Sequence, residues 1–383
     1  MSSTSETSVV TVFLRHRGAV LLLRRSADVG SYPGRWGAVA GHVEDDTPRA
    51  SAYEEIEEET GLSESNVSLV REGPSFAVED EERGIRWRVH PFLFEADTRS
   101  ISTNWETEAA EWASPTVLLR RETVPELWTS YRRVAPSVVD LRDDTIHGSA
   151  YLSVRALEVL RDRAGLLATA DANDIDDPRA RLVHTAERLL DARPTMAALA
   201  NRVHRVMHAC LPELAPAAVE QEAHAAIDRA HEAESSAADT AADLLDGGRV
   251  LTLSRSGTVA AALRRGTPDS IVIATSHPGG EGIGVAESLA DDGPDVALVP
   301  DAAVASVLAT HEIDFVLVGA DTVDSSGTVV NKVGTRAAAL AAHHERIPFY
   351  VACSIDKISP APQESTEAAD RHSVYDGPAP LQV

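Results

Sequence analysis

The sequence predicts an α/β protein made of more than one folding unit. With 383 residues and 43% apolar content, the chain is too long for one ordinary hydrophobic core. From Arg249 onward, short apolar segments alternate with helical ones, which predicts right-handed crossovers and a doubly wound, Rossmann-like parallel sheet. A strand-rich segment and then a run of Ala-rich helices precede it. We therefore expect an N-terminal domain at 1–135, a helical subdomain at 136–245, a Rossmann-like ligand-binding domain at 246–360 and a tail at 361–383.

The N-terminal domain shows strand patterns on both sides of one polar helix. Residues 8–25 predict two strands around a turn at Arg17 and Gly18, and residues 36–40 form a third short apolar segment. Residues 85–96 alternate between apolar and polar side chains, as a strand does. Residues 112–119 begin the last elements of this domain. A mixed, strand-rich domain is expected here.

In the rest of the chain, the spacing of apolar residues first becomes helical and then alternates between strand and helix segments. Apolar residues recur with helical spacing at 149–164, 179–191, 195–210 and 217–245. Five buried-strand segments follow, separated by helical ones; they are RVLTLS, SIVIATSHP, DVALVP, DFVLVGAD and PFYVACS. The tail after Pro360 is polar and Pro-rich, a composition typical of disorder.

The charge balance excludes some classes of partner. The chain has 60 acidic and 35 basic residues and a formal net charge of -25, which argues against direct binding to nucleic acid or to an anionic membrane surface. Of the basic residues, 33 are Arg and two are Lys. An acidic surface of this kind is typical of a halophilic, high-salt cytoplasm. Small molecules or proteins are the expected partners.

Localisation follows from what the sequence lacks. No stretch approaches the roughly 20 apolar residues that a membrane span needs, and the first ten residues do not form a signal peptide. Cys210 and Cys353 are too few and too far apart for a disulfide framework or a thiolate metal site. A soluble, cytoplasmic protein is expected.

One helix is clearly delimited in the sequence. Thr47 can cap its N-terminus, Pro48 suits the first helical position, and Gly61 can end it. Within it, three glutamates lie at i, i+3 and i+4 and share one face; they are Glu55, Glu58 and Glu59. Like charges at this spacing repel by about 0.2–0.5 kcal/mol per pair, and a divalent cation would reverse that penalty. Oxygen ligands suit Mg2+ or Mn2+. The alternative is a solvated acidic helix.

The helix and the loop before it resemble the Nudix hydrolase family. The family's box ends in Glu, two residues, Glu-Glu, one residue, Gly and an aliphatic residue, and here the last two are Gly61 and Leu62. The preceding segment WGAVAGHVE also resembles the family's entry to the box, and the likeness covers about residues 8–130. It implies an α/β/α sandwich with a mixed sheet and pyrophosphohydrolase activity.

The same resemblance implies roles for individual residues. Glu58 and Glu59 would be metal ligands, and Glu55 a further ligand or the base for the attacking water. The carbonyl of Ala40 is an additional possible ligand. Glu106 resembles the distal carboxylate of some members, and the alternative is a surface-loop glutamate.

The box departs from the family pattern at three positions. Glu54 replaces the arginine before the first glutamate, Ala40 the first glycine and Asp46 the upstream glutamate. Loss of the arginine removes a cation that would hold the carboxylates in place.

A second group of polar residues lies at the predicted strand ends of the C-terminal domain. In a doubly wound sheet, ligands bind beyond the carboxyl ends of the strands. Polar residues follow four of these strands; they are Ser254, Arg255, Ser256, Ser276, His277, Asp301 and Asp321. Asn331 and Lys332 are expected to open the next helix, with Lys332 as a phosphate ligand. For Ser256, Gly257 and Asp301 a cap or turn role is favoured.

These segments resemble a superfamily that contains the alpha, beta and delta subunits of translation initiation factor 2B, ribose-1,5-bisphosphate isomerase and methylthioribose-1-phosphate isomerase. The stretches that carry the likeness run from about Thr145 to Lys357; they are TIHGSAYLSVRALEVL, ARPTMAALANRV, LTLSRSGTV, ATSHPGGEG, VGADTV, NKVGT and IPFYVACSIDK. The resemblance implies a homo-oligomer and a domain that binds a nucleotide or sugar phosphate.

The isomerase chemistry of that superfamily is disfavoured here. The resemblance puts its aspartate at Asp321, but Ser254 stands at the cysteine position, and a hydroxyl is a far weaker acid than a thiol. Two phosphate-binding arginines of the isomerases are replaced by His147 and His277, which could still bind phosphate when protonated, but not as planar forks. Ligand binding by these residues is therefore still expected.

The sequence is compatible with three alternative functions. The first is a magnesium-dependent Nudix hydrolase that acts on a nucleoside-diphosphate-linked substrate and is fused to a ligand-binding domain. The second is a non-catalytic regulatory protein related to initiation factor 2B, and the third is a phosphosugar isomerase like ribose-1,5-bisphosphate isomerase. The Nudix substrate is not readable from the box, because specificity lies in loops outside it.

Overall fold

The computed structural model describes residues 5–43, 47–171, 176–290, 294–359 and 381–382. The chain forms two compact units. The first, here the N-terminal unit, comprises Met1–Ser137, Glu158–Val183 and Pro212–Ile227; the second, here the C-terminal unit, comprises Val138–Leu157, His184–Leu211 and Asp228–Val383. The expectations for Asp46 and for most of the tail at 361–383 lie outside the described residues.

A mixed eight-stranded sheet forms the centre of the N-terminal unit. Its main path is β3-β2-β1-β7-β5, with β4 paired to β1, β6 to β7 and β8 to β2. The β1–β7 pair is parallel and the other pairs are antiparallel. The strands are β1 (Ser5–His16), β2 (Ala19–Arg25), β3 (Trp36–Gly37), β4 (Val39–His42), β5 (Val67–Glu72), β6 (Phe76–Asp80), β7 (Ile85–Ala96) and β8 (Thr107–Ala113). The predicted mixed sheet is confirmed.

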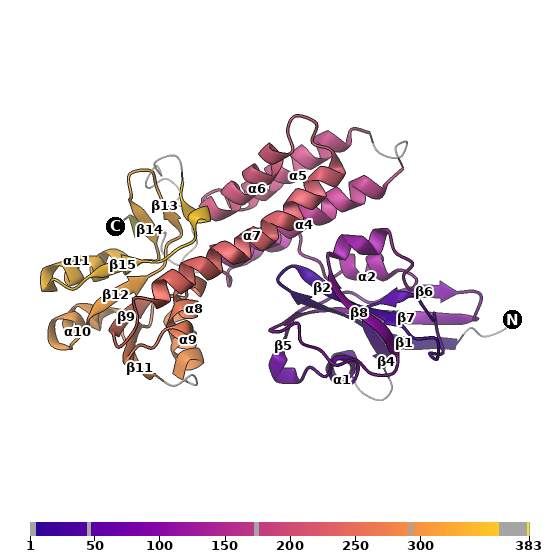
Figure 1. Ribbon diagram of the computed structural model, residues 1–383, viewed down its shortest axis with the longest axis horizontal. Helices are drawn as coiled ribbons and strands as arrows, with labels where there is room; N and C mark the ends of the chain where they lie inside the picture. The colour runs from indigo at the N-terminus through magenta and orange to yellow at the C-terminus, as the bar shows by residue number, and fades with distance from the viewer. Residues whose placement is uncertain (1–4, 44–46, 172–175, 291–293, 360–380, 383) are drawn as a thin grey trace. The chain divides into compact units, whose positions relative to one another are not determined.

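Helices cover both faces of this sheet (Figure 1). Helix α1 (Pro48–Thr60) packs Ala52 and Ile56 against one face, which also carries Val10. Helix α2 (Leu127–Arg132) packs Tyr131 against the other face, which carries Phe13. Successive strand residues alternate between faces, so one strand supplies both cores. This is the expected sandwich.

Helix α1 begins and ends at the predicted residues. The Thr47 hydroxyl accepts a hydrogen bond from the Ala50 N–H at 3.3 Å, and Pro48 is the first helical residue. Gly61 has the left-handed φ of 68°, and its N–H donates to the Glu57 carbonyl at 2.9 Å. Both ends are therefore fixed by local hydrogen bonds.

The predicted helices of the middle region are present with shifts of a few residues at their ends. They are α4 (Ser149–Thr169), α5 (Pro178–Ala192), α6 (Ala197–Ala209) and α7 (Pro216–Ala242), preceded by α3 (Val138–Asp143). Short 3-10 turns occur elsewhere; they are η1 (Glu64–Asn66), η2 (Pro115–Leu119), η3 (Asp301–Ala303) and η4 (Ile355–Lys357).

A buried ion cluster fixes α6 in the C-terminal unit. Asp356 in η4 is 2% exposed and accepts from the Arg202 Nε at 2.8 Å and from Arg205 at 2.7 Å. Arg202 is also 2% exposed and donates to the Ser153 hydroxyl at 2.6 Å. The charges are thus paired and hydrogen-bonded, as buried charges must be.

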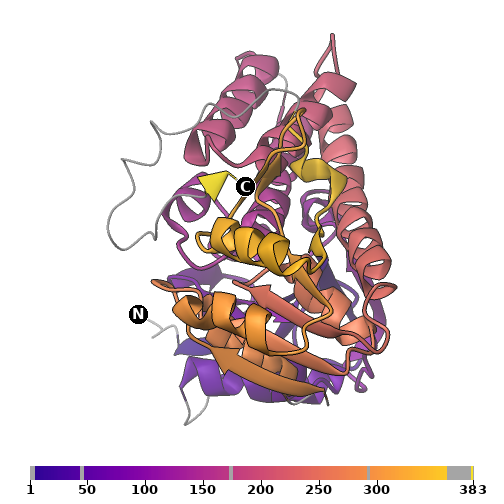
Figure 2. The same cartoon turned by 90° about the vertical axis from the view of Figure 1, so that its left-hand side faces the viewer.

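Five parallel strands form the main sheet of the C-terminal unit, in the order β11-β10-β9-β12-β15. They are β9 (Arg249–Leu253), β10 (Ser270–Ala274), β11 (Asp295–Val299), β12 (Phe315–Val318) and β15 (Phe349–Val351). Residues of α7, α8 (Gly257–Arg265) and α9 (Glu281–Ala290) pack on one face, and those of α10 (Val304–Thr310) and α11 (Thr335–Glu345) on the other. Figure 2 shows α10 and α11 side by side. The doubly wound sheet is confirmed.

The segment before α11 differs from expectation. Thr322–Val323 (β13) and Val329–Asn331 (β14) form a small antiparallel hairpin, to which β16 (Leu381–Gln382) adds a third strand. Asn331 therefore ends a strand, and α11 begins only at Thr335, after a turn at Gly334 with φ of 100°. Across the described ranges, none of the helices has the length and apolar character needed to span a membrane.

Candidate functional site

A cavity of about 760 Å³ in the N-terminal unit gathers most of the predicted catalytic residues. Glu55 and Glu58 reach it from α1, Glu106 from the loop before β8, and Ala40 from β4. Glu54 lines it as well. Carboxylates from the α1 helix and from a loop far away in the sequence thus line the same cavity.

Glu59 lies behind the cavity wall. Its side chain is buried, the residue being 4% exposed, and it accepts a hydrogen bond from the Ala40 N–H at 3.4 Å. Next to Ala40, Gly41 lies directly under the Glu55 carboxylate. A Cβ added at Gly41 would come within 1.5 Å of the Glu55 Oε1 atom, so any other residue there would displace that carboxylate.

Two carboxylates of this cluster, Glu55 and Glu59, have raised pKa values. Burial raises the pKa of Glu55 to about 7, and the charges of Glu58, Glu106 and Glu54 add to the effect. Burial likewise raises the pKa of Glu59 to about 8, with a contribution from Glu55. The carboxylate at position 54 therefore adds repulsion where the family's arginine would relieve it.

The donor set fits a hard divalent cation. Within the described ranges, no three His, Cys, Asp or Glu side chains converge closely enough to hold a metal ion as a cage. Magnesium keeps several of its waters and is bound through one or two carboxylates together with substrate phosphates, so a cage is not required. Clustered carboxylates whose negative forms are disfavoured are the groups that such a cation stabilises.

Two of the predicted ligand residues of the C-terminal unit, Ser254 and His277, lie at adjacent strand ends together with Ser276 and Asp301. Ser254 follows β9 and Ser276 follows β10, and both have left-handed backbones, with φ of 64° and 63°. The Ser254 N–H donates to the Ser276 hydroxyl at 2.6 Å. Asp301 accepts from the backbone N–H groups of Ser276 and His277, both at 2.7 Å. Side chains forced into this conformation are often found at binding sites.

Lys332 meets a carboxylate that the sequence did not indicate. Its Nζ donates to Glu281, the first residue of α9, and a Cβ added at Gly279 would come within 2.5 Å of the same carboxylate. Burial raises the pKa of Asp321, opposed by the charges of Lys357 and Lys332. Lys357 is 5% exposed and donates to the Ala320 carbonyl at 2.7 Å.

Two predicted residues have other partners. The Asn331 amide donates to the Thr335 hydroxyl at 3.0 Å, which holds the turn before α11. The His147 ring lies 2.7 Å from an Asp144 oxygen and stacks on Tyr151, with 4.0 Å between ring centroids. In the structure these two side chains make local contacts.

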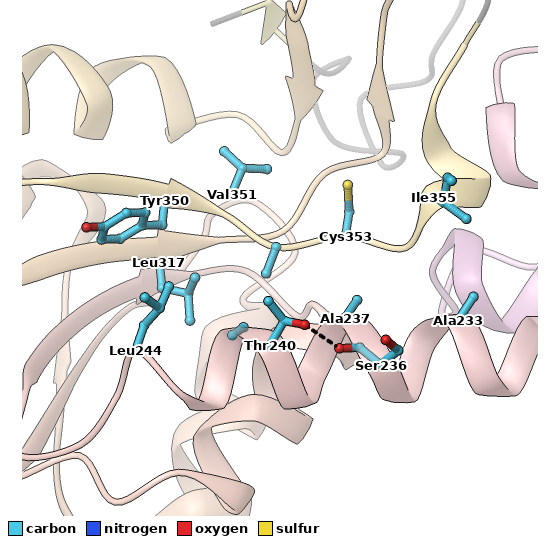
Figure 3. A pocket seen from close by; sticks show the side chains of 12 residues that line it. Ala233, Ser236, Ala237, Thr240, Leu244, Leu317, Tyr350, Val351, Cys353 and Ile355 are labelled. Atoms are coloured by element: carbon cyan, nitrogen blue, oxygen red, sulfur yellow. Dashed lines mark hydrogen bonds between the residues drawn. The ribbon is translucent and has the colours of Figure 1, made fainter.

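A second hollow, of about 370 Å³, lies between α7 and the segment that carries β15 (Figure 3). Its lining is mostly small or apolar, and Cys353 is its sulfur-bearing member. Tyr350 and Ile355 are 41% and 69% exposed. It contains none of the predicted ligand residues.

Comparison with known families accounts for both halves of the chain. The model of the Initiation factor 2 subunit family matches residues 145–377, more than half of the sequence. The chain belongs to the Initiation factor 2 subunit family. The NUDIX domain model matches residues 4–134, so the chain carries an N-terminal NUDIX domain fused to the initiation factor 2 subunit domain.

Proteins similar to the initiation factor 2 subunit domain are named either as sugar-phosphate isomerases or as translation initiation factors. A ribose 1,5-bisphosphate isomerase of Haloferax volcanii is 32% identical over 227 residues, 56% of this chain and 68% of the relative. A methylthioribose-1-phosphate isomerase of Anaeromyxobacter is 32% identical over 61% of this chain and 70% of the relative. A solved Pyrococcus horikoshii structure named translation initiation factor eIF-2B is 26% identical, covers 59% of this chain and 80% of that one, and has a TM-score of 0.52.

Sequence patterns did not indicate several residues of these sites. Tyr32, Trp87 and Trp105 line the NUDIX cavity beside the carboxylates. The alternation of residues 85–96 could have indicated that Trp87 shares a face with Val89, but not that this face borders a cavity. Glu281 lies in a quoted motif, yet its ion pair with Lys332 joins separate segments.

Proposed function

We propose that the NUDIX domain is a pyrophosphohydrolase dependent on Mg2+ or Mn2+ that acts on a nucleoside diphosphate linked to a further group. The observation that carries the proposal is that Glu55, Glu58 and Glu106 line one cavity, with Glu59 buried and hydrogen-bonded to Ala40 of its lining. The NUDIX domain model matched to residues 4–134 supports hydrolysis as the reaction class.

Position and charge suggest separate roles for these residues in metal binding and in proton transfer. Glu58 and Glu59, with Glu106 and the Ala40 carbonyl as further donors, would hold the cation. The chemistry that a bound cation would supply is neutralisation of phosphate charge and a lowered pKa of bound water. Glu55, whose pKa of about 7 is near that of a useful general base, would accept the proton as water attacks phosphorus.

The direct test is product release from a panel of nucleoside diphosphates, dinucleoside polyphosphates and nucleotide sugars. Full-length protein is assayed with magnesium, with manganese and with a chelator. Turnover that requires the cation is expected for at least one class. A complete lack of turnover on the panel with either cation would overturn the hydrolase proposal.

Magnesium is expected to stabilise the protein more at high pH than at low pH. The pKa values of Glu55 and Glu59 are raised, so in metal-free protein their contribution to stability is fully present below about 4.5 and is lost as the pH rises through about 7 and 8. A cation that favours the charged carboxylates offsets this loss. At a concentration tenfold above its Kd it would contribute about 1.4 kcal/mol.

Thermal unfolding at pH 6.0 and pH 8.5, with MgCl2 or with NaCl of equal ionic strength, measures this effect. The rise in Tm with magnesium should be a few degrees at pH 8.5 and much smaller at pH 6.0. In Glu59→Gln the dependence on pH should weaken. An equal rise in Tm at both pH values would contradict the prediction.

We also propose that the initiation factor 2 subunit domain binds a nucleotide or sugar phosphate at the strand ends, in a homo-oligomeric protein. The charges of Lys332 and Lys357 near Asp321 support this, as do the left-handed backbones of Ser254 and Ser276. Binding without isomerisation is favoured because Ser254 has a hydroxyl where acid–base chemistry would need a more acidic group.

Removal of the Glu281 carboxylate is expected to strengthen phosphate binding at this site. Glu281 already pairs with Lys332 and lies over Gly279, so an incoming phosphate must compete with it. Glu281→Gln should bind ribose 1,5-bisphosphate or inorganic phosphate about tenfold more tightly in calorimetry, the scale of one charge-assisted contact. Glu287→Gln, an exposed carboxylate of the same helix, is the matched control. Unchanged or weaker affinity in Glu281→Gln would count against this arrangement.

The alternative with specific support is a non-catalytic regulator related to initiation factor 2B. Position 54 holds a glutamate where the family pattern has an arginine, and the charge of Glu54 contributes to the raised pKa of Glu55. In that case neither domain would turn over a substrate, while phosphate binding at Lys332 would persist. An isomerase like the named relatives would instead convert ribose 1,5-bisphosphate, and a rate lost in Asp321→Asn would favour it.

A further inference from the structure

One face of the NUDIX sheet continues the cavity away from the carboxylates. Val9 of β1 pairs with Val89 of β7 and with His42 of β4, and Trp87 of β7 pairs with Val78 of β6. Directly paired residues point to the same side of a sheet. All five line the 760 Å³ cavity. They form a continuous surface of rings and branched side chains, here called the aromatic wall.

The rings of the aromatic wall and of Tyr32, next to it, are held in place. The His42 and Trp87 ring centroids are 6.0 Å apart. The Tyr32 hydroxyl donates to Asp80 at 2.5 Å. The Arg83 guanidinium lies 4.4 Å from the Tyr32 ring centroid and pairs with Asp80 at 3.1 Å. A ring surface held by such contacts loses little freedom when a flat ligand binds.

The aromatic surface begins one residue from the carboxylates. His42 follows Gly41, which lies under the Glu55 carboxylate. Trp105 precedes Glu106 and lines the same cavity, and its side chain is exposed, the residue being 66% accessible. A ligand whose diphosphate lies at the carboxylates must therefore place its neighbouring group among these rings.

We propose that the aromatic wall is a nucleobase subsite, with Trp87 as the main stacking residue and Trp105 as a second ring at the rim. The assignment rests on the proposed function, because it presumes that a diphosphate occupies the carboxylate end. Stacking of a base on an aromatic side chain corresponds to about 5- to 150-fold in affinity. A purine covers more ring area than a pyrimidine, so purine nucleotides are the preferred class.

A binding experiment tests the subsite without any need for turnover. The probes are adenosine diphosphate with a methylene bridge, which resists cleavage between its phosphates, and methylenediphosphonate, which lacks the nucleoside. Affinities for full-length protein are measured by calorimetry and tryptophan fluorescence, with and without magnesium, so that the magnesium-dependent component reports the NUDIX site. The nucleotide is expected to bind at least tenfold more tightly than methylenediphosphonate.

Substitutions assign that difference to the rings. Trp87→Leu should reduce the ratio of the two affinities to about threefold or less, and Trp105→Ala should reduce it about fivefold while methylenediphosphonate binding is unchanged. Because Trp105 is largely exposed, its replacement leaves the fold intact even if Trp87→Leu does not. Trp112→Phe, outside the cavity, is the matched control and should leave both affinities unchanged.

The outcomes separate this inference from the proposed hydrolase. A nucleotide bound no more tightly than methylenediphosphonate, or a ratio unaffected by Trp87→Leu and Trp105→Ala, would overturn the base subsite. A ratio that depends on Trp87, in a protein with no turnover on the substrate panel, would retain the subsite and remove the hydrolase. Glu58→Gln should weaken magnesium-dependent binding of both probes equally.

Discussion

Glu58→Gln is expected to lower magnesium-dependent turnover by about 100-fold or more. Glu58 faces the cavity from α1, and its charge contributes to the raised pKa of Glu55. Groups that only orient a metal ligand commonly account for 10- to 100-fold in activity, and a direct ligand should exceed them. The Glu58 side chain is exposed, so its loss should not change Tm in the absence of metal. Initial rates on the best substrate of the panel measure the effect.

Glu57→Gln is the matched control for this result. Glu57 is the preceding residue of the same helix, also exposed, and it does not line the cavity. Its replacement removes the same charge from α1 but should leave the rate within about twofold. Equal losses in the two variants would mean that general acidity of the helix, rather than metal ligation, supports turnover.

Asp356→Asn is expected to destabilise the C-terminal unit by about 3–5 kcal/mol at pH 7. The carboxylate is buried between Arg202 and Arg205, and Arg202 is itself buried, so the substitution removes its shorter ion pair and leaves the longer one to Glu234, at 3.4 Å. Burial alone would raise the pKa of Asp356, but its hydrogen bonds and ion pairs with these arginines outweigh burial and hold the pKa below its usual value. A lowered pKa means that the contribution is present above about pH 4 and is lost as the pH falls through the folded pKa.

Urea unfolding of the full-length protein at several pH values tests this prediction. The difference in the free energy of unfolding between wild type and Asp356→Asn should be largest near pH 7 and should shrink below about pH 4. Asp295→Asn replaces an exposed aspartate of β11 and should change stability by less than about 0.5 kcal/mol. A loss in Asp356→Asn no larger than this would contradict the prediction.

Local hydrogen-bonding rules explain why much of the fold was predictable. Thr47, Pro48 and Gly61 fix α1 through contacts within four residues, so the sequence alone predicted both its ends and its shared glutamate face. The parallel strands β9, β10 and β12 are buried on both faces and appear as continuous apolar runs. The β13–β14 hairpin was missed because strands of two and three residues are too short to show a period.

The candidate sites were less predictable because their geometry comes from distant pairs. The resemblance to the NUDIX family identified the helix glutamates, and the structure places Glu55 and Glu58 at the cavity. The register that puts Trp87 beside Val78 and the fold that brings Tyr32 to Asp80 are tertiary. The same holds for Lys332, whose ion pair with Glu281 depends on the loop between β10 and α9. Roles for these residues stay predictions that the experiments above test.

The scarcity of lysine makes amine chemistry a local probe of this protein. Apart from the N-terminal amine, the two primary amines of the whole sequence are Lys332 and Lys357. Lys357 is 5% exposed and bound to a carbonyl, whereas the Lys332 side chain is 17% exposed and held by Glu281. An acylating reagent should therefore mark Lys332 ahead of Lys357, and its rate of labelling would report when that ion pair opens. In most proteins such a reagent labels lysines over the whole surface, but here, apart from the N-terminal amine, its two targets are both lysines of the C-terminal unit.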